Sequence, residues 1–248
     1  SMKVTHAVIE KLRSRSSRME IYAIVQVRMT SQRFPGKALR KVEGKPLITF
    51  LLERINRCYG IDKIVIATST DKSDDPINDY CITNAVTCHR GSLNNVSERF
   101  NDIIKENNIE AFVRLSGDSP LIDQEIIDKA ASLFRENDYD IVTNVLRRTY
   151  PKGQSVEVLG SSAFLKAFSE IKKEKYCEHI TTYFYDNKEN YKIHNFVSSK
   201  NVGDVQLSVD TKDDMNVFEQ IVARMDRPHW QYNWEEVLGL RNCIVNRA

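Results

Sequence analysis

The chain has 248 residues, of which 41% are hydrophobic, enough to bury the core of one large α/β domain or two small ones. Its 36 basic and 34 acidic residues give a formal charge of +2, so no global field favours binding to nucleic acid or to an anionic membrane. No apolar run reaches the roughly 18 residues of a membrane span and no signal-peptide core is present, so we expect a cytoplasmic protein. Five cysteines without a CxxC pair indicate reduced thiols rather than disulfides or a structural zinc site.

Residues 1–19 are basic and predict a tail that precedes one folded domain at 20–248. Within that domain, apolar runs alternate with amphipathic stretches. The run IYAIVQV at 21–27 is almost continuously apolar, which is typical of a strand covered on both faces. Further strands are expected at 63–69, 86–88, 111–118 and 139–144, with helices between them at 46–58, 75–85, 96–107 and 125–136. This order predicts an α/β fold with a mostly parallel sheet and helices on both faces.

The regular alternation ends near residue 150. The stretch 150–160 predicts a turn and a short strand. The remaining sequence predicts helices at 161–171, 175–187, 212–225 and 233–240, with strands at 192–199 and 204–210. No internal repeat or linker separates this part from the first, so we interpret it as an insertion into the same domain and its completion.

Polar residues follow the predicted strands where each strand ends. Ligands of parallel sheets bind outside the carboxyl ends of the strands. We therefore expect one crevice to be lined by Arg28 to Lys37, Thr68, Ser69, Arg90, Gly91, Gly117, Asp118 and Asn144.

The first of these loops, in the sequence AIVQVRMTSQRFPGKAL, carries concentrated positive charge but matches neither GxxxxGK[ST] nor GxGxxG. Arg28 and Arg33 can bind phosphate oxygens as forks, and Lys37 offers a compact charge. Gly36 permits a backbone conformation that points N–H groups at an oxyanion. Three cations suit a triphosphate better than a single carboxylate; the alternative is a solvated charged loop.

Two acidic residues stand at the ends of apolar runs in the same crevice. Asp118 follows Gly117, and Asp210 ends the run LSVD. A carboxylate beside phosphate-binding cations suits Mg²⁺, which usually takes one or two carboxylates together with phosphate oxygens. The alternative for Asp210 is the N-cap of the following helix, in whose first turn Asp213 and Asp214 are expected to cap.

The sequence resembles the cytidylyltransferase-like family that includes the spore coat polysaccharide biosynthesis protein F group and, more distantly, the CMP-sialic acid and CMP-Kdo synthetases. The matching stretches run in order over residues 21–215: VQVRMTSQRFPGKAL, GKPL, IVIATSTDKSDDPI, HRGSLNNVSERF, VRLSGDSPLID, TN, YPKGQSVEV, CEHIT and LSVDTKDD. The resemblance implies a three-layer Rossmann-like nucleotidyltransferase fold with a smaller β-hairpin and helical insertion.

The resemblance also implies a reaction. A sugar or sugar-acid hydroxyl attacks the α-phosphate of CTP in the presence of Mg²⁺, giving a CMP-sugar for surface polysaccharide synthesis and pyrophosphate. Catalytic roles fall to Arg28, Lys37, Asp118 and Asp210, and the last two hold the metal. The implied nucleotide-binding residues are Arg28, Ser31, Arg33, Gly36, Lys37, Thr68, Ser69, Arg90, Gly91 and Asp118.

Acceptor binding, by the same resemblance, involves Asn144, Glu157, Glu178 and His179. Residues 150–200 are then an acceptor-binding and dimerisation insertion, and a homodimer is expected. The family often has Asp where this chain has Ser155, and polar or acidic residues where it has Lys152, so the sugar is left open. For His179 a structural role at a helix end is the alternative.

Two other functions are alternatives. One is a glycosyltransferase that consumes a nucleotide-sugar, although no DxD metal motif stands at a strand end. The other is a catalytically inactive nucleotide-sensing protein. A nucleic-acid partner is not expected, because no stripe of basic and aromatic residues occurs.

Overall fold

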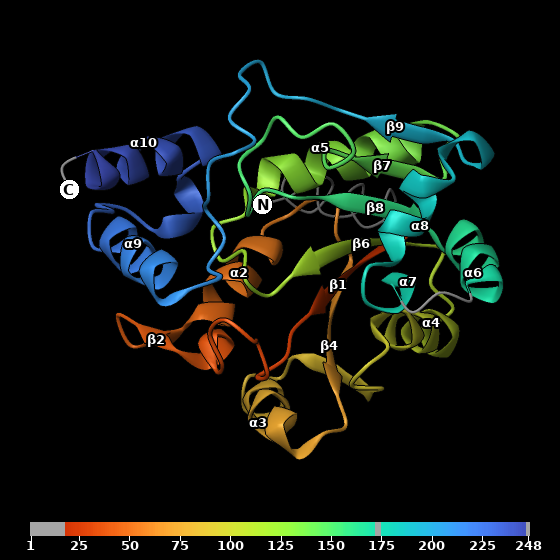
Figure 1. The fold of residues 1–248 in the computed structure, drawn as a ribbon, viewed down its shortest axis with the longest axis horizontal. Coiled ribbons are helices and arrows are strands. Elements are labelled where there is room, and N and C mark those ends of the chain that lie inside the picture. The colour runs from red at the N-terminus through yellow and green to blue at the C-terminus, as the bar shows by residue number, and fades with distance from the viewer. Residues whose placement is uncertain (1–17, 172–174, 247–248) are drawn as a thin grey trace, which may run out of the picture.

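A computed structural model of the chain describes residues 18–171 and 175–246, so the tail expected at 1–19 lies almost wholly outside the described residues (Figure 1). Within these ranges, seven strands form one sheet. In spatial order they are β5 (Thr87–Gly91), β4 (Lys63–Ser69), β1 (Ile21–Gln26), β6 (Ala111–Ser116), β8 (Glu157–Gly160), β7 (Ile141–Thr143) and β9 (Ile193–Asn195). β8 pairs antiparallel with β6 and β7, and the other pairings are parallel, so the prediction of a mostly parallel sheet is confirmed.

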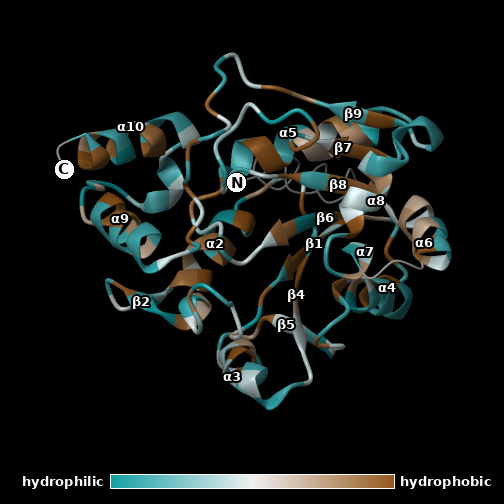
Figure 2. Ribbon diagram, viewed as in Figure 1, coloured by the Kyte–Doolittle hydropathy of each residue, from teal (hydrophilic) through white to brown (hydrophobic). Residues whose placement is uncertain are grey.

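Helices cover both faces of the sheet, which confirms the three-layer α/β architecture. Along β1, Ala23 and Val25 pack on one face, and Tyr22 and Ile24 pack on the other. The first face is covered by α2 (Leu47–Ile55), α3 (Asp75–Thr83) and α5 (Gln124–Glu136). The second is covered by α4 (Val96–Asn107), α6 (Ser161–Glu170) and α8 (Ile180–Asp186). Figure 2 shows hydrophobic residues along β1 and β6 inside the molecule. In the described part of the chain no helix is long and apolar enough to cross a membrane.

A third apolar cluster lies beside the sheet and joins the two C-terminal helices to the segment 34–50. It contains buried residues of α9 (Lys212–Val222) and α10 (Trp234–Val245), which pack with Phe34, Val42 and Leu47. The small antiparallel hairpin is formed by β2 (Lys41–Val42) and β3 (Lys45–Pro46). Short elements complete the structure: η1 (Lys37–Leu39), η2 (Lys72–Asp74), α7 (Lys175–Glu178), η3 (Lys188–Asn190) and η4 (His229–Gln231). Residues 150–200 contribute β8, β9 and α6 to α8.

The strand predicted at 204–210 is wrong. This segment forms only an isolated bridge, between Gln206 and Lys152. Its alternating apolar residues, Leu207 and Val209, are buried in the third cluster instead of in a sheet. The alternation of apolar residues therefore predicts correctly which side chains are buried, but it does not predict that the segment pairs as a strand.

The helix predicted at 175–187 is interrupted. His179 has φ −126° and ψ 68°, so the helix stops at α7 and restarts as α8 with His179 as its N-cap. His179 at this break lines both cavities described below.

The carboxyl ends of the parallel strands lie at one edge of the sheet. Gln26 pairs with Ala67 of β4 on one side and with Ser116 of β6 on the other, so the loops that follow start at the same level. Because β8 is reversed, it begins at this edge, where Glu157 pairs with Arg114. The turn before β8 therefore meets the loops that follow β1 and β6.

Candidate active site

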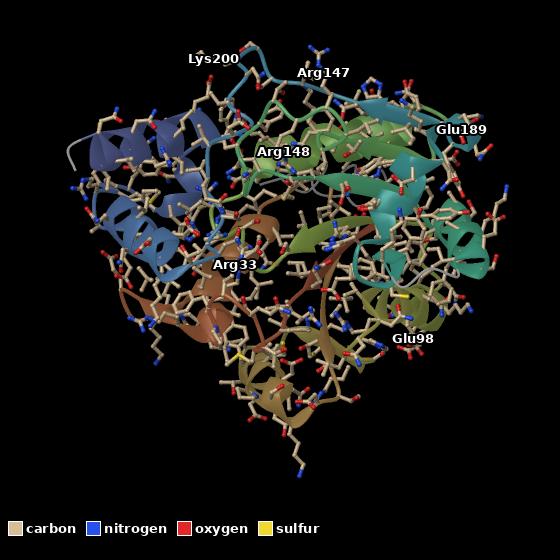
Figure 3. All side chains as sticks on the ribbon, viewed as in Figure 1. Arg33, Glu98, Arg147, Arg148, Glu189 and Lys200 are labelled. Carbon is tan, nitrogen blue, oxygen red and sulfur yellow. The ribbon has the colours of Figure 1, made fainter. Side chains whose placement is uncertain are left out.

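A cavity of about 600 Å³ opens at this edge of the sheet. It is lined by the loop after β1, the end of β6, the start of α8 and the segment before α9. Eight of the predicted site residues line it: Arg28, Ser31, Arg33, Lys37, Asp118, Glu178, His179 and Asp210. The structure thus brings together all four residues predicted to be catalytic. Arg33 lies near the middle of the view in Figure 3.

The loop after β1 is held by its own backbone and by a buried acid. Gly36 adopts φ 76°, a left-handed conformation suited to glycine, and its N–H donates to the carbonyl of Met29 at 2.8 Å. The Met29 N–H in turn donates to Asp74 Oδ1 at 2.7 Å. Asp74 is fully buried and also accepts hydrogen bonds from the backbone and side chain of Ser69. Ser69 therefore helps to fix the loop indirectly, because it donates to the Asp74 carboxylate that binds the Met29 N–H.

Lys37 lies between the two predicted metal ligands. Its Nζ donates to Asp210 Oδ1 at 3.3 Å, to Asp118 Oδ2 at 3.5 Å and to the carbonyl of Val209 at 2.7 Å. Arg33 forms a second ion pair with Asp210 at 3.1 Å. Burial alone raises the pKa of Asp210, but Lys37, Gln206 and Arg33 together lower it below its ordinary value. The carboxylates of Asp118 and Asp210 therefore lie on either side of the Lys37 ammonium, at a point that already accommodates a cation.

These carboxylates fit a magnesium ion that also takes oxygens from a substrate. In residues 18–171 and 175–246, no group of three or more His, Cys, Asp or Glu side chains is arranged to hold a metal. A magnesium ion bound by only two protein carboxylates needs further oxygen ligands, and phosphates are its usual source. The donor set thus suits a metal–triphosphate complex and not a metal bound by protein alone.

Two further cations, Arg28 and Arg99, also line the first cavity. Arg28 bonds Glu178 Oε1 at 2.6 Å and donates to the carbonyl of Leu93 at 2.9 Å. Burial, reinforced by the nearby Arg28 charge, lowers the pKa of Arg99 to about 10. Sequence reasoning missed Arg99, although a signal existed: it occupies a position of the apolar stripe of α4, between Val96 and Ile103.

A second cavity of about 410 Å³ adjoins the first and shares Ser116, Asp118 and His179 with it. Glu157, one of the residues predicted to bind the acceptor, lines this second cavity. Arg114 Nη1 donates to Glu157 Oε2 at 2.7 Å. The Tyr185 hydroxyl also donates to Glu157, and burial together with this carboxylate raises the pKa of Tyr185 well above its ordinary value.

Several predicted site residues do not line either cavity. Asn144 is buried, where it donates to the carbonyl of Gln154 at 2.7 Å and accepts from the N–H of Val156 at 2.9 Å, so it shapes the turn before β8. Thr68 and Ser69 are fully buried. Arg90 donates to the carbonyls of Ser69 and Asp71 and pairs with Asp75 at 2.7 Å. The expectation that Thr68, Ser69, Arg90, Gly91 and Asn144 line the same crevice is therefore not met.

Comparison with known proteins identifies the family. The sequence model of the family described as "Cytidylyltransferase" matches residues 22–237. The chain is 30% identical over 214 residues to the spore coat polysaccharide biosynthesis protein SpsF of Bacillus subtilis, covering 82% of this chain and 85% of that protein. It is 31% identical over 119 residues to the 3-deoxy-manno-octulosonate cytidylyltransferase of Geobacter sulfurreducens, covering 48% of this chain and 47% of that one.

A solved structure gives the same result. The structure of a cytidylyltransferase from Leptospira borgpetersenii superposes with a TM-score of 0.87 at 27% sequence identity, covering 92% of this chain and 96% of that one. The similarity therefore extends over the sheet and over the segments that carry both cavities.

Proposed function

The chain belongs to the cytidylyltransferase family and is a nucleotidyltransferase, and we propose that it joins a sugar or sugar acid to the cytidylyl group of CTP. A hydroxyl oxygen of the acceptor forms a bond to the α-phosphorus as the bond from that phosphorus to the bridging oxygen breaks. The hydroxyl loses its proton, and the products are a CMP-sugar and pyrophosphate. We assign this reaction to the synthesis of a surface polysaccharide.

One observation carries the proposal: Lys37 stands between Asp118 and Asp210 in a cavity that also holds Arg28 and Arg33. Phosphoryl-type transfer needs little covalent chemistry from the protein and depends on positioning and on neutralising charge. The cations suit the β- and γ-phosphates, whose charge grows as they leave. The carboxylates would hold Mg²⁺, which supplies charge neutralisation at the phosphate oxygens when it is bound.

The acceptor is assigned to the second cavity. His179 lines both cavities, so it stands where an acceptor hydroxyl would meet the nucleotide. We propose that His179 contacts this hydroxyl and that Glu157 binds another hydroxyl of the sugar. The name of the Geobacter relative makes 3-deoxy-manno-octulosonate the first acid to test. A homodimer formed through residues 150–195 is part of the proposal and is checked by sedimentation velocity.

The test measures pyrophosphate release from CTP, ATP, GTP and UTP, with magnesium or with EDTA, against a panel of sugar acids and neutral sugars. Release that requires CTP, magnesium and one class of acceptor is the expected result. Folded protein that releases pyrophosphate from none of the nucleotides would contradict it. In that case CTP binding without turnover would indicate a nucleotide-sensing protein, and consumption of a CMP-sugar would indicate a glycosyltransferase.

A further inference from the structure

Each of the two carboxylates proposed to bind magnesium uses its two oxygens differently. Asp118 Oδ2 and Asp210 Oδ1 accept from Lys37 Nζ, at 3.5 and 3.3 Å, so these oxygens face the point where the ammonium lies. The second oxygen of Asp118, Oδ1, accepts from the Ser119 hydroxyl at 3.2 Å. The second oxygen of Asp210, Oδ2, accepts from Gln206 Nε2 at 3.0 Å. A neutral donor therefore fixes the rotation of each carboxylate and leaves the oxygen that faces the cation available.

The orientation of the Gln206 amide follows from its partners. Besides Asp210, its Nε2 donates to the carbonyl of Ser208 at 3.1 Å and to the hydroxyl of the same residue at 2.7 Å. A carboxylate and a carbonyl can only accept hydrogen bonds, so the amide nitrogen, and not the amide oxygen, must face them. Gln206 thus presents a donor to Asp210.

The backbone of Gln206 is held from two sides. Arg241 Nε, on α10 (Figure 1), donates to the carbonyl of Gln206 at 3.0 Å. Residues 205–207 bond to the backbone of the turn before β8 through two hydrogen bonds of 2.8 Å. The N–H of Val209 donates to the carbonyl of Asp118 at 2.8 Å, so the same segment is also tied to the residue that carries the other carboxylate. The Gln206 amide therefore reaches Asp210 from a backbone that is itself fixed.

We propose that Gln206 is a positioning residue, which holds the Asp210 carboxylate with Oδ1 turned toward the cation and so favours the binding of magnesium. The inference rests on the proposed function and adds to it the residue that orients a proposed metal ligand. Without the Gln206 amide, both oxygens of Asp210 can turn toward Lys37 and Arg33. The carboxylate must then be reordered before a metal binds, and loss of such an orienting hydrogen bond typically lowers metal affinity about 10- to 100-fold.

The test compares CTP binding in magnesium with CTP binding in EDTA. Isothermal titration without an acceptor measures both, so no turnover is needed, and the ratio of the two Kd values is the magnesium gain. Gln206→Met keeps the length of the side chain but has no donor, and it should lower the magnesium gain about tenfold. Its Kd for CTP in EDTA should stay unchanged, because Arg28 and Arg33 remain. Gln206→Ala is a second variant that should show the same loss, and thermal melts in EDTA check that both fold.

Two control variants separate the orientation of Asp210 from other effects. Gln220→Met is the same substitution at an exposed position of α9 and should keep the wild-type magnesium gain. Ser208→Ala removes the hydroxyl partner of Gln206 but leaves its hydrogen bond to Asp210, so it should keep the gain as well.

Equal weakening of CTP binding in magnesium and in EDTA would give Gln206 a purely structural role and overturn the inference. A full magnesium gain in Gln206→Met, an equal loss in Ser208→Ala, or a wild type that binds CTP with no magnesium gain would also overturn it. Failure of the proposed function looks different, because the wild type would then bind no nucleotide in either buffer.

Discussion

Single residues on the two sides of the first cavity neutralise each other. Arg28 follows β1, on the side assigned to the nucleotide, and Glu178 ends α7, on the side assigned to the acceptor, yet their side chains bond at 2.6 Å. A triphosphate that binds Arg28 must compete with this carboxylate. The side chains are 29% and 36% exposed, so the pair is partly screened by water and contributes no more than a surface ion pair.

Glu178→Gln should therefore tighten CTP binding, because it removes the competing charge and keeps the shape. The expected gain is up to about fivefold in Kd, which corresponds to the energy of a partly exposed ion pair. Isothermal titration with CTP and magnesium measures it, and Glu98→Gln on the exposed side of α4 is the control. Weaker binding in Glu178→Gln would mean that the carboxylate orders the site and does not compete.

Asp118→Asn should lower the rate of pyrophosphate release by several orders of magnitude, because one of the two carboxylates proposed to hold magnesium is lost. The exposed Asp204→Asn serves as the control. A thermal melt of each variant separates loss of chemistry from loss of folding. Turnover of Asp118→Asn near that of the wild type would remove Asp118 from the proposed mechanism.

At the scale of elements, the loop after β1 depends on η2. Asp74 lies in η2 and connects the Met29 N–H of this loop to Ser69 at the end of β4. Three hydrogen bonds end on one fully buried carboxylate, so its charge is compensated by donors from two neighbouring strand ends. The geometry of the loop proposed to bind phosphate is thus set partly by a residue that lines neither cavity.

Asp74→Asn should destabilise the fold by about 1.5–3 kcal/mol, because it replaces a charged acceptor of hydrogen bonds in a buried place. It should also weaken CTP binding through the loop. Urea unfolding and CTP titration check the two effects, with the exposed neighbour Asp75→Asn as the control. Unchanged stability together with unchanged CTP binding would show that the loop after β1 keeps its conformation without the Asp74 carboxylate.

The elements show how far sequence patterns could predict this structure. The helix at 96–107 has the predicted bounds, because Asn95 caps it through Glu98 N–H and its apolar spacing is regular. A strand is predicted at 204–210 because apolar and polar residues alternate there. This alternation shows that one side of the segment is buried, but not that the segment pairs with another strand. Thr211 caps α9, so the alternative of an N-cap role for Asp210 is also wrong.

The structure brings some of the predicted site residues together and places others away from both cavities. Lys37, Asp118 and Asp210 were predicted from their types and from their places at ends of apolar runs, and they meet. Arg90 lies at the end of β5 and Asn144 follows β7, but their side chains bond to backbone carbonyls. Sequence position gives the edge of the sheet on which a residue lies, and only packing decides where its side chain points.

At the scale of the whole molecule, the third cluster depends on a buried histidine. The His229 ring packs at a tilt against Phe50, with ring centroids 4.9 Å apart, and its Nε2 lies 2.7 Å from Glu53 Oε2, so η4 is packed onto α2. Burial lowers the pKa of His229 from 6.5 to about 4, although Glu53 opposes this shift. The folded protein therefore holds this ring neutral at pH values where the unfolded chain protonates it.

Stability should fall on mild acidification for this reason. Unfolding takes up a proton at His229 between pH 6.5 and 4, so the free energy of unfolding drops as the pH falls, by about 2 kcal/mol between pH 7 and pH 5. Urea unfolding across this range measures it. His229→Gln should flatten the pH dependence even if it lowers stability at every pH. An equal slope in wild type and His229→Gln would contradict this assignment.

The reversed strand β8 has a consequence for how this protein can change over evolution. Because β8 runs against β6 and β7, the turn at 148–156 reaches this edge of the sheet from outside the succession of loops proposed to bind the nucleotide. Under the proposed function, substitutions in this turn can change the acceptor while the loop between β1 and η1 stays the same. Exchange of that one turn between relatives is accordingly the shortest route to a new product from the same nucleotide.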